Sequence, residues 1–158
     1  MKGTHPTAFI HPLAYIAGDV TIGPRVSVWP FASIRGDSDV VTIDEDTNVQ
    51  DGCVIHVDQG VPCRIGKRVG IGHRAIVHGA VVENDVLIGM GAVLLNGVRV
   101  SSGSIIGAGS VVREGFVVPP NCLVLGVPGR IVRETTMQER DRIAKTVEAY
   151  IELQERYR

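Results

Sequence analysis

Residues 82–124 decide the fold, and they read VENDVL IGMGAV LLNGVR VSSGSI IGAGSV VREGFV VPPNCL V in blocks of six. Every block begins with an aliphatic residue: Val82, Ile88, Leu94, Val100, Ile106, Val112, Val118 and Val124. Neither the 3.6-residue period of a helix nor the two-residue period of a strand explains this spacing. A unit of one short strand and one corner does explain it, because three such units close one turn of a triangular prism.

The same spacing extends toward the N-terminus, with interruptions. Its members there are Ile16, Ile22, Val28, Ile34, Ile43, Val49, Ile55, Ile65, Ile71 and Val77. The step from Ile34 to Ile43 is three residues too long, that from Ile55 to Ile65 four too long, and that from Val77 to Val82 one too short. The 18 units from Ile16 to Val124 predict about six turns. We therefore expect an all-β solenoid, a parallel β-helix with the aliphatic residues inside.

Composition supports this fold and excludes several functions. The 158 residues suit a single domain, and with 44% hydrophobic but only 4% aromatic residues the core must be aliphatic. A net charge of -1 offers no basic surface for nucleic acid or an anionic membrane. No apolar run approaches the roughly 20 residues that span a bilayer, and the N-terminus lacks a signal-peptide pattern. We expect a cytoplasmic protein whose cysteines, Cys53, Cys63 and Cys122, are small buried hydrophobic residues.

The C-terminal segment has a different pattern. The β-helix is expected to occupy residues 1–130, and residues 131–158 are expected to form a helix that packs on it, within one domain. Thr135 and Gln138 have the spacing of a capping box. An amphipathic stripe at helical spacing follows, formed by Met137, Arg140, Ile143, Ala144, Val147, Tyr150, Ile151 and Gln154.

Two histidines are expected to stack on one face of the prism. His56 directly follows the inside residue Ile55, and His78 directly follows the inside residue Val77, so both side chains should point outward. Their separation of 22 residues equals one 18-residue turn plus the four-residue insertion. Such stacking in consecutive turns is what two ligands of one metal ion need.

A third histidine belongs to the neighbouring face. His73 lies two residues after the inside residue Ile71; Asp51 occupies the same place one turn earlier, and Gln50 lies beside it. The outward directions of two faces of a triangular prism differ by about 120°, so His73 is poorly aimed at the other two histidines of its own chain. In a cyclic trimer a neighbouring chain could supply it. Three imidazoles with an open fourth position form a catalytic zinc site; the alternative is a trimer interface that carries polar residues without a metal.

The chain resembles the gamma-class carbonic anhydrases and their hexapeptide-repeat relatives over nearly its whole length. The resemblance is carried by Arg35-Gly36-Asp37, by residues 48–56 (NVQDGCVIH), by residues 71–79 (IGHRAIVHG) and by residues 87–92 (LIGMGA). It implies a left-handed β-helix, a homotrimer, and zinc at the subunit interfaces. By this resemblance His56 and His78 would bind the metal from one subunit and His73 from the next, with Fe²⁺ or Co²⁺ as other candidate ions.

The resemblance also implies roles for other residues. Arg35 matches an arginine that pairs across the interface with an aspartate, here Asp51. Gln50 matches a glutamine near the metal-bound water, while Asn48 and Asp37 match positions that line the same site. The best-known members carry a glutamate after the first of these segments and an acidic loop after the first histidine. Here that loop is short, and its Asp58 is the candidate proton relay.

The activity implied is reversible hydration of carbon dioxide to bicarbonate. Zinc lowers the pKa of a bound water from about 15.7 to about 7, which makes hydroxide available at neutral pH. Two other functions stay open. One is acyl transfer or thioester hydrolysis with coenzyme A substrates, which is common among hexapeptide β-helices, and the other is a non-catalytic scaffold.

Overall fold

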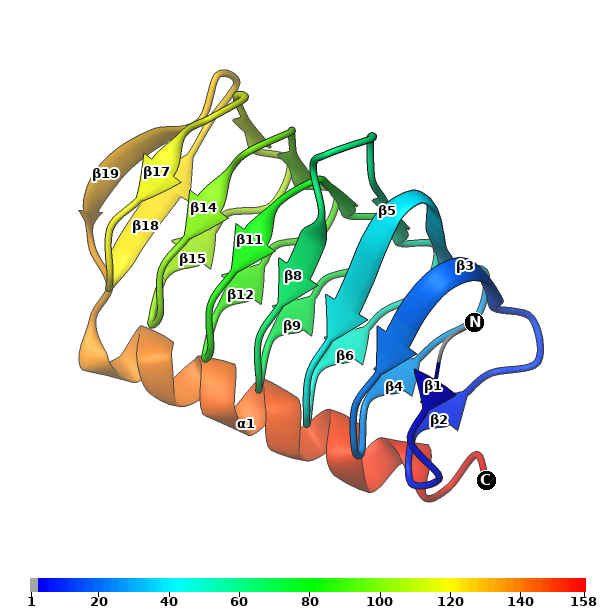
Figure 1. Ribbon diagram of the computed structural model, residues 1–158. Coiled ribbons are helices and arrows are strands. Elements are labelled where there is room, and N and C mark those ends of the chain that lie inside the picture. Colours follow the sequence, from blue (N-terminus) through cyan, green and yellow to red (C-terminus); the bar gives the residue numbers. More distant parts are fainter. Residues whose placement is uncertain (1–2) are drawn as a thin grey trace.

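The computed structural model describes residues 3–158, which form a left-handed parallel β-helix with one C-terminal helix (Figure 1). One face of the prism is an eight-stranded sheet. Its strands are β2 (Phe9–Ile10), β4 (Ser27–Val28), β6 (Asn48–Val49), β9 (Gly70–Ile71), β12 (Leu87–Ile88), β15 (Ile105–Ile106), β18 (Cys122–Leu125) and the antiparallel β19 (Arg130–Glu134). The seven strands before β19 mark seven coils. The coil beyond the expected six begins at Phe9, which pairs with Ser27 one turn later.

The other two faces are the arms of an 11-stranded sheet. Its strands are β1 (Gly3–Thr4), β3 (Tyr15–Ile22), β5 (Ser33–Ile43), β7 (Val54–His56), β8 (Cys63–Ile65), β10 (Ile76–His78), β11 (Val81–Val82), β13 (Val93–Leu94), β14 (Arg99–Val100), β16 (Val111–Val112) and β17 (Val117–Val118). The two arms join at β5, which pairs with β7 on one side and with β8 on the other. β5 thereby absorbs the first insertion, since it runs without a break from Ser33 to Ile43.

The aliphatic residues that recur every six positions form the core, as the sequence predicts. Ile55, Ile71, Ile88, Leu94 and Ile106 are fully buried in one continuous aliphatic cluster. Ladders between coils join residues 18 positions apart, such as Ile88 with Ile106. All three cysteines are free and buried, which confirms their expected place.

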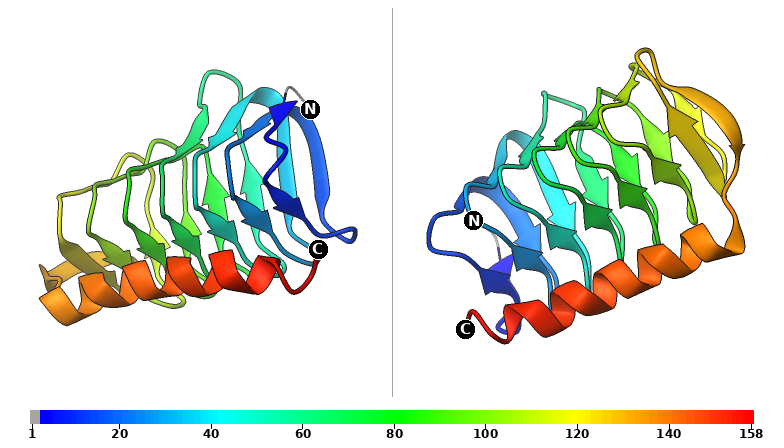
Figure 2. Two further views of the ribbon diagram at one scale, coloured as in Figure 1. Left: turned by 90° about the horizontal axis from the view of Figure 1, so that it is seen from below. Right: turned by 180° about the vertical axis from the view of Figure 1, so that it is seen from behind.

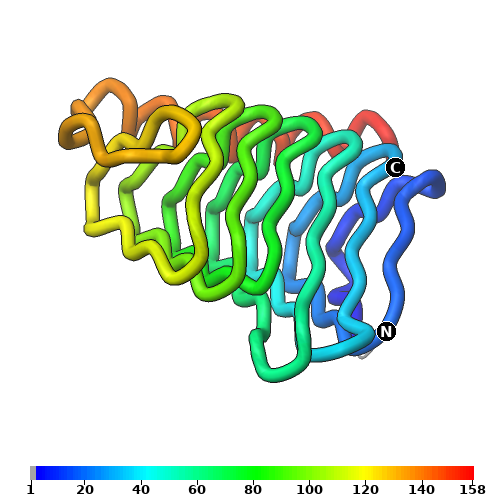
Figure 3. Tube along the Cα trace, turned by 90° about the horizontal axis from the view of Figure 1, so that it is seen from above, coloured from blue at the N-terminus to red at the C-terminus, as the bar shows by residue number. Residues whose placement is uncertain are grey.

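The second insertion forms the loop between β7 and β8, which projects beyond the neighbouring coils (teal in Figure 3). The backbone N–H of Val61 donates to the carbonyl of Asp58 at 3.0 Å, which closes the loop on itself. The loop therefore holds Asp58 just beyond the end of β7.

Helix α1 (Met137–Gln154) lies along the eight-stranded sheet and runs back toward the first coils (Figure 2). Ile143 packs with Ile105 and Leu123, so that face of the prism is covered on its outer side. The expected capping box is displaced by one residue. Thr136 is the N-cap and pairs with Glu139, whereas the Thr135 hydroxyl donates to the carbonyl of Gly103 and holds the entering chain against the prism.

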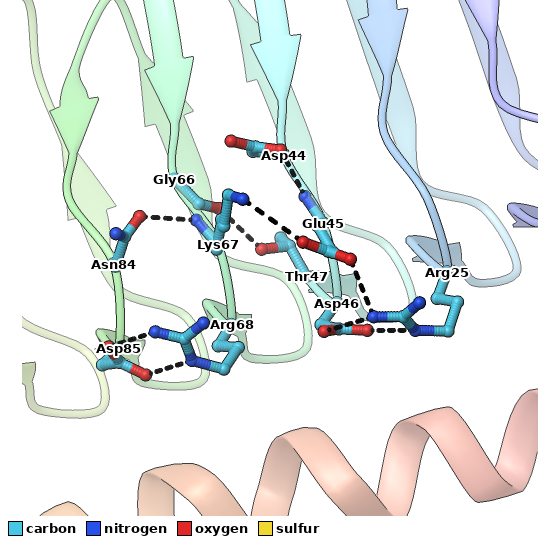
Figure 4. Close-up of polar contacts among 10 residues, drawn as sticks. All are labelled: Arg25, Asp44, Glu45, Asp46, Thr47, Gly66, Lys67, Arg68, Asn84 and Asp85. Atoms are coloured by element: carbon cyan, nitrogen blue, oxygen red, sulfur yellow. Dashed lines mark hydrogen bonds and ion pairs between the residues drawn. The ribbon is translucent and has the colours of Figure 1, made fainter.

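Ion pairs connect successive coils along one corner of the prism (Figure 4). The Arg25 guanidinium donates to both carboxylate oxygens of Asp46, at 2.7 and 2.9 Å, and that of Arg68 donates to both of Asp85, at 2.6 and 2.7 Å. All four residues have positive φ, between 51° and 61°. Among residues 3–158, no helix is both long and apolar enough to cross a bilayer.

Candidate metal centre

His56 and His78 end two adjacent strands and are paired in register. Nδ1 of His56 lies 3.0 Å from Nε2 of His78, and the rings meet edge to face with centroids 5.1 Å apart. Both side chains are partly buried. The stacking predicted from the 22-residue spacing is therefore present.

Each of these rings is held at its other nitrogen by an acceptor. Nε2 of His56 lies 2.7 Å from Oδ1 of Asp37, and a carboxylate can only accept, so this nitrogen carries the hydrogen. Nδ1 of His78 lies 2.8 Å from Oδ1 of Asn96. The Asn96 amide in turn donates from Nδ2 to Asp58 at 2.7 Å, which fixes its oxygen toward His78.

It follows that the two nitrogens facing each other both present lone pairs. A neutral imidazole has one donor and one acceptor nitrogen, and the donors are already committed to Asp37 and Asn96. With both rings neutral, two lone pairs face each other at 3.0 Å, an arrangement that a metal cation can satisfy. Zinc–imidazole bonds are about 2.0–2.1 Å long, so one ion reaches both nitrogens, and the donor set fits a metal. Within residues 3–158 the cluster suited to a metal is His56, Asp58 and His78, whose candidate ligand atoms lie within 4.8 Å of one another.

His73 lies apart from this cluster and follows β9 on the neighbouring face. Its backbone N–H donates to Oε1 of Gln50 at 3.1 Å, and Nε2 of Gln50 donates to Oδ1 of Asn48 at 3.0 Å. Nδ1 of His73 lies 3.1 Å from Oδ2 of Asp51. With that nitrogen facing a carboxylate, the lone pair of a neutral His73 lies on Nε2, the nitrogen left free to bind a ligand.

A groove of about 370 Å³ opens beside His73, between the residues that follow β9, strands β12 and β15, and helix α1. Its wall includes Gln50, Met90, Arg142 and Tyr150. Burial raises the pKa of Tyr150 to about 12, so this phenol stays protonated at neutral pH. The ring packs edge to face on Trp29, with centroids 5.5 Å apart, which holds the helix against the second coil.

The acidic and basic residues predicted for the interface lie in two places. Arg35 lies 3.0 Å from Asp37 of its own chain, whereas Asp51 lies beside His73. The hydrogen bond from His56, followed by smaller contributions that include Arg35, lowers the pKa of Asp37 below its usual range. Asp37 therefore stays ionised and keeps accepting from His56.

Two residues of this region were not predicted from the sequence. Asn96 was not expected to contact His78, and Tyr150 was not expected to line the groove. Asn96 had an available signal, because it stands two residues after the inside residue Leu94, one coil beyond Val77 and His78. Tyr150 was assigned only to the packing stripe of the helix, since the groove depends on how that helix meets the prism.

A family profile described as "Bacterial transferase hexapeptide (six repeats)" matches residues 4–36 and 79–114. A protein of Methanocaldococcus jannaschii named "Probable carbonic anhydrase" is 53% identical over 142 residues, which cover 90% of this chain and 89% of that protein. The chain belongs to the hexapeptide-repeat family that includes this relative.

Other members of the family carry different names. The "Carnitine operon protein CaiE" of Escherichia coli is 40% identical over 135 residues, which cover 85% of this chain and 69% of that protein. A crystal structure of a "hexapeptide transferase family protein" from Anaplasma phagocytophilum has a TM-score of 0.95 at 36% identity and covers 98% of this chain and 92% of that one. Membership thus establishes the fold, and the reaction must be argued from the site.

Proposed function

We propose that the protein catalyses the reversible hydration of carbon dioxide at a zinc centre shared between subunits of a cytoplasmic homotrimer. The observation that carries the proposal is the pair of facing ring nitrogens, Nδ1 of His56 and Nε2 of His78, 3.0 Å apart on strands paired in register. The 53% identical relative named for this activity supports the same reaction.

His73 is the proposed third ligand, supplied by the adjacent subunit. Its side chain is 45% exposed and stands on a different face from the other two histidines. When faces of two chains meet in a cyclic trimer, an exposed side chain on one can complete a pair on the other. Zinc held by three imidazoles would supply an activated water as the nucleophile at neutral pH.

The remaining residues orient the reactants. Because Oε1 of Gln50 is occupied by the N–H of His73, and one Nε2 hydrogen by Asn48, the second Nε2 hydrogen is the group available to the groove. It can donate to an oxygen of carbon dioxide or of bicarbonate. Asn48 would keep that amide from rotating, and Asp37 would keep His56 in the tautomer that presents Nδ1.

Mixing two inactive variants tests the shared site. His73→Ala and His78→Ala should each purify as folded trimers without metal. Trimers refolded or co-expressed from both chains should regain about a quarter of the wild-type metal and hydration rate per chain. The reason is that random assembly leaves one intact interface in each mixed trimer. No recovery in demonstrably mixed trimers would show that the three histidines do not act across an interface.

Acyl transfer with a coenzyme A thioester is the second candidate. It is favoured by the 36% identical transferase-family structure and by the groove beside His73, whose volume of about 370 Å³ exceeds that of a small gas molecule. In that case a thioester substrate should turn over in metal-free protein, and His73→Ala should remove activity while His56→Ala leaves it. Metal-dependent hydration lost in both variants distinguishes the anhydrase.

A further inference from the structure

We infer that Asn96, held by Asp58, is a positioning residue that fixes the tautomer and the ring orientation of His78. The inference rests on the proposed function only in taking His78 as a metal ligand. The arrangement of hydrogen bonds around Asn96 can be tested without any metal.

The backbone at Asn96 is held rigidly. Asn96 begins a corner that stacks on the corner after His78, since the N–H of Gly97 donates to the carbonyl of Gly79 at 2.8 Å. On the other side, the N–H of Gly115 donates to the carbonyl of Asn96 at 2.9 Å. With coils packed above and below, and the side chain half-buried, the amide has little freedom to move.

Asp58 determines which way the amide points. Its Oδ2 lies 2.7 Å from Nδ2 of Asn96, and an ionised carboxylate has no hydrogen to give, so the NH₂ group must face it. The amide oxygen is then directed at Nδ1 of His78, at 2.8 Å, and only a protonated Nδ1 satisfies it. The lone pair of His78 is thereby assigned to Nε2, the atom that faces His56.

This contact explains what the four-residue insertion contributes. Asp58 and Asn96 are 38 residues apart, and the loop after His56 lets Asp58 reach across a full coil to meet the corner at Asn96. Without the insertion, the residue at the position of Asp58 would lie in the wall of the prism and could not reach Asn96. Asp58 therefore acts on His78 through Asn96, a different role from that of a proton relay.

Residues that hold a ligand's second nitrogen typically change metal affinity by about 10–100-fold when removed. We expect zinc affinity, measured by competition with a chromogenic chelator, to fall about 10–100-fold in Asn96→Ala while the trimer stays folded. The paired change Asn96→Asp with Asp58→Asn reverses the donor and acceptor of the clamp but keeps an acceptor facing His78. It should recover most of the affinity that Asn96→Asp alone loses, because two carboxylates face each other in the single variant.

The matched control is Asn84→Ala. Asn84 also lies at a corner and accepts a hydrogen bond through Oδ1, but from the backbone N–H of Lys67, away from the histidines. Its removal should leave zinc affinity unchanged, which separates loss of the clamp from general loosening of a corner.

The decisive readout is the tautomer of His78 in metal-free protein, taken from the ¹⁵N chemical shifts of the ring. Wild type should be protonated at Nδ1, and Asn96→Ala should shift the ring toward protonation at Nε2. An unchanged tautomer together with unchanged zinc affinity in Asn96→Ala would overturn the inference and leave the proposed function standing. If wild-type protein binds no zinc, but the tautomer of His78 still changes in Asn96→Ala, the proposed function would be overturned and the role of Asn96 and Asp58 would stand.

Discussion

Val117 and Val118 are neighbours on strand β17 that lie on opposite sides of the prism wall: Val117 is 56% exposed, and Val118 is fully buried. The same alternation holds along most strands, because each inside residue is followed or preceded by one that faces out. The pair offers a matched test of the core, since residue type, strand and coil are identical.

The prediction is that Val118→Asp unfolds the chain or costs about 3–5 kcal/mol, because it leaves a charge without a partner inside an aliphatic core. Val117→Asp should change the free energy of unfolding by less than about 1 kcal/mol. Chemical denaturation followed by circular dichroism measures both. Similar losses in the two variants would be inconsistent with the assignment of inside positions.

The cysteines provide a test of burial. Burial raises the pKa of both Cys53 and Cys63 to about 12, so at pH 8 roughly one in ten thousand of these thiols is ionised. Neither should react with Ellman's reagent in the native protein within minutes, and both should react at once in guanidinium chloride. Rapid native modification of either would mean that the coils open far more readily than the packing indicates.

Backbone strain can be tested at the corner of the prism that carries Arg68 and Asp85. Arg68 has φ of 54°, and the stacked positions two and three coils on are Gly103 and Asn121. The free energy of unfolding of Arg68→Gly should lie within about 1 kcal/mol of that of wild type, because relief of backbone strain offsets the loss of an exposed ion pair to Asp85. Arg68→Val should cost about 1–3 kcal/mol more, since a β-branched residue fits this conformation poorly. Equal stability of the two variants would contradict the strained corner.

The start of helix α1 should be sensitive to acid. The Arg133 guanidinium, followed by the backbone N–H of Thr136, lowers the pKa of Glu139 from 4.5 to about 2. A depressed pKa gives a stabilisation that is complete above pH 4.5 and is lost as the pH falls toward 2. The difference in Tm between wild type and Glu139→Gln should therefore be constant near neutrality and vanish at low pH. A difference that did not depend on pH would rule out the charged contact.

The aliphatic period of six could be read directly from the sequence because core positions depend only on residue type and spacing. The pairing of His56 with His78 was also predictable, since the spacing of 22 residues absorbs the insertion. The first coil was missed although Ile10 continues the period, since it lies six residues before Ile16 and pairs with Val28 one coil later.

The other features that the sequence did not predict are side-chain hydrogen bonds; the pairing register of the strands was predicted. Two adjacent threonines precede α1, and spacing could not show that Thr135 is engaged by Gly103, which leaves Thr136 to cap the helix. The contacts of Asp37 with His56, and of Asp58 with Asn96, depend on how β5 and the loop after β7 turn out of the repeat. Insertions break the very period on which the prediction depends.

The in-register histidines are proposed to form a metal centre that hydrates carbon dioxide. This proposal is tested most directly by metal content per chain on anaerobically purified protein, with stopped-flow carbon dioxide hydration on the same sample. We expect about one zinc or iron per chain, as a filled three-imidazole site requires, and hydration that His73→Ala abolishes without unfolding the β-helix. A well-folded wild-type trimer that holds no metal, or one fully loaded with metal that does not hydrate carbon dioxide, would contradict it.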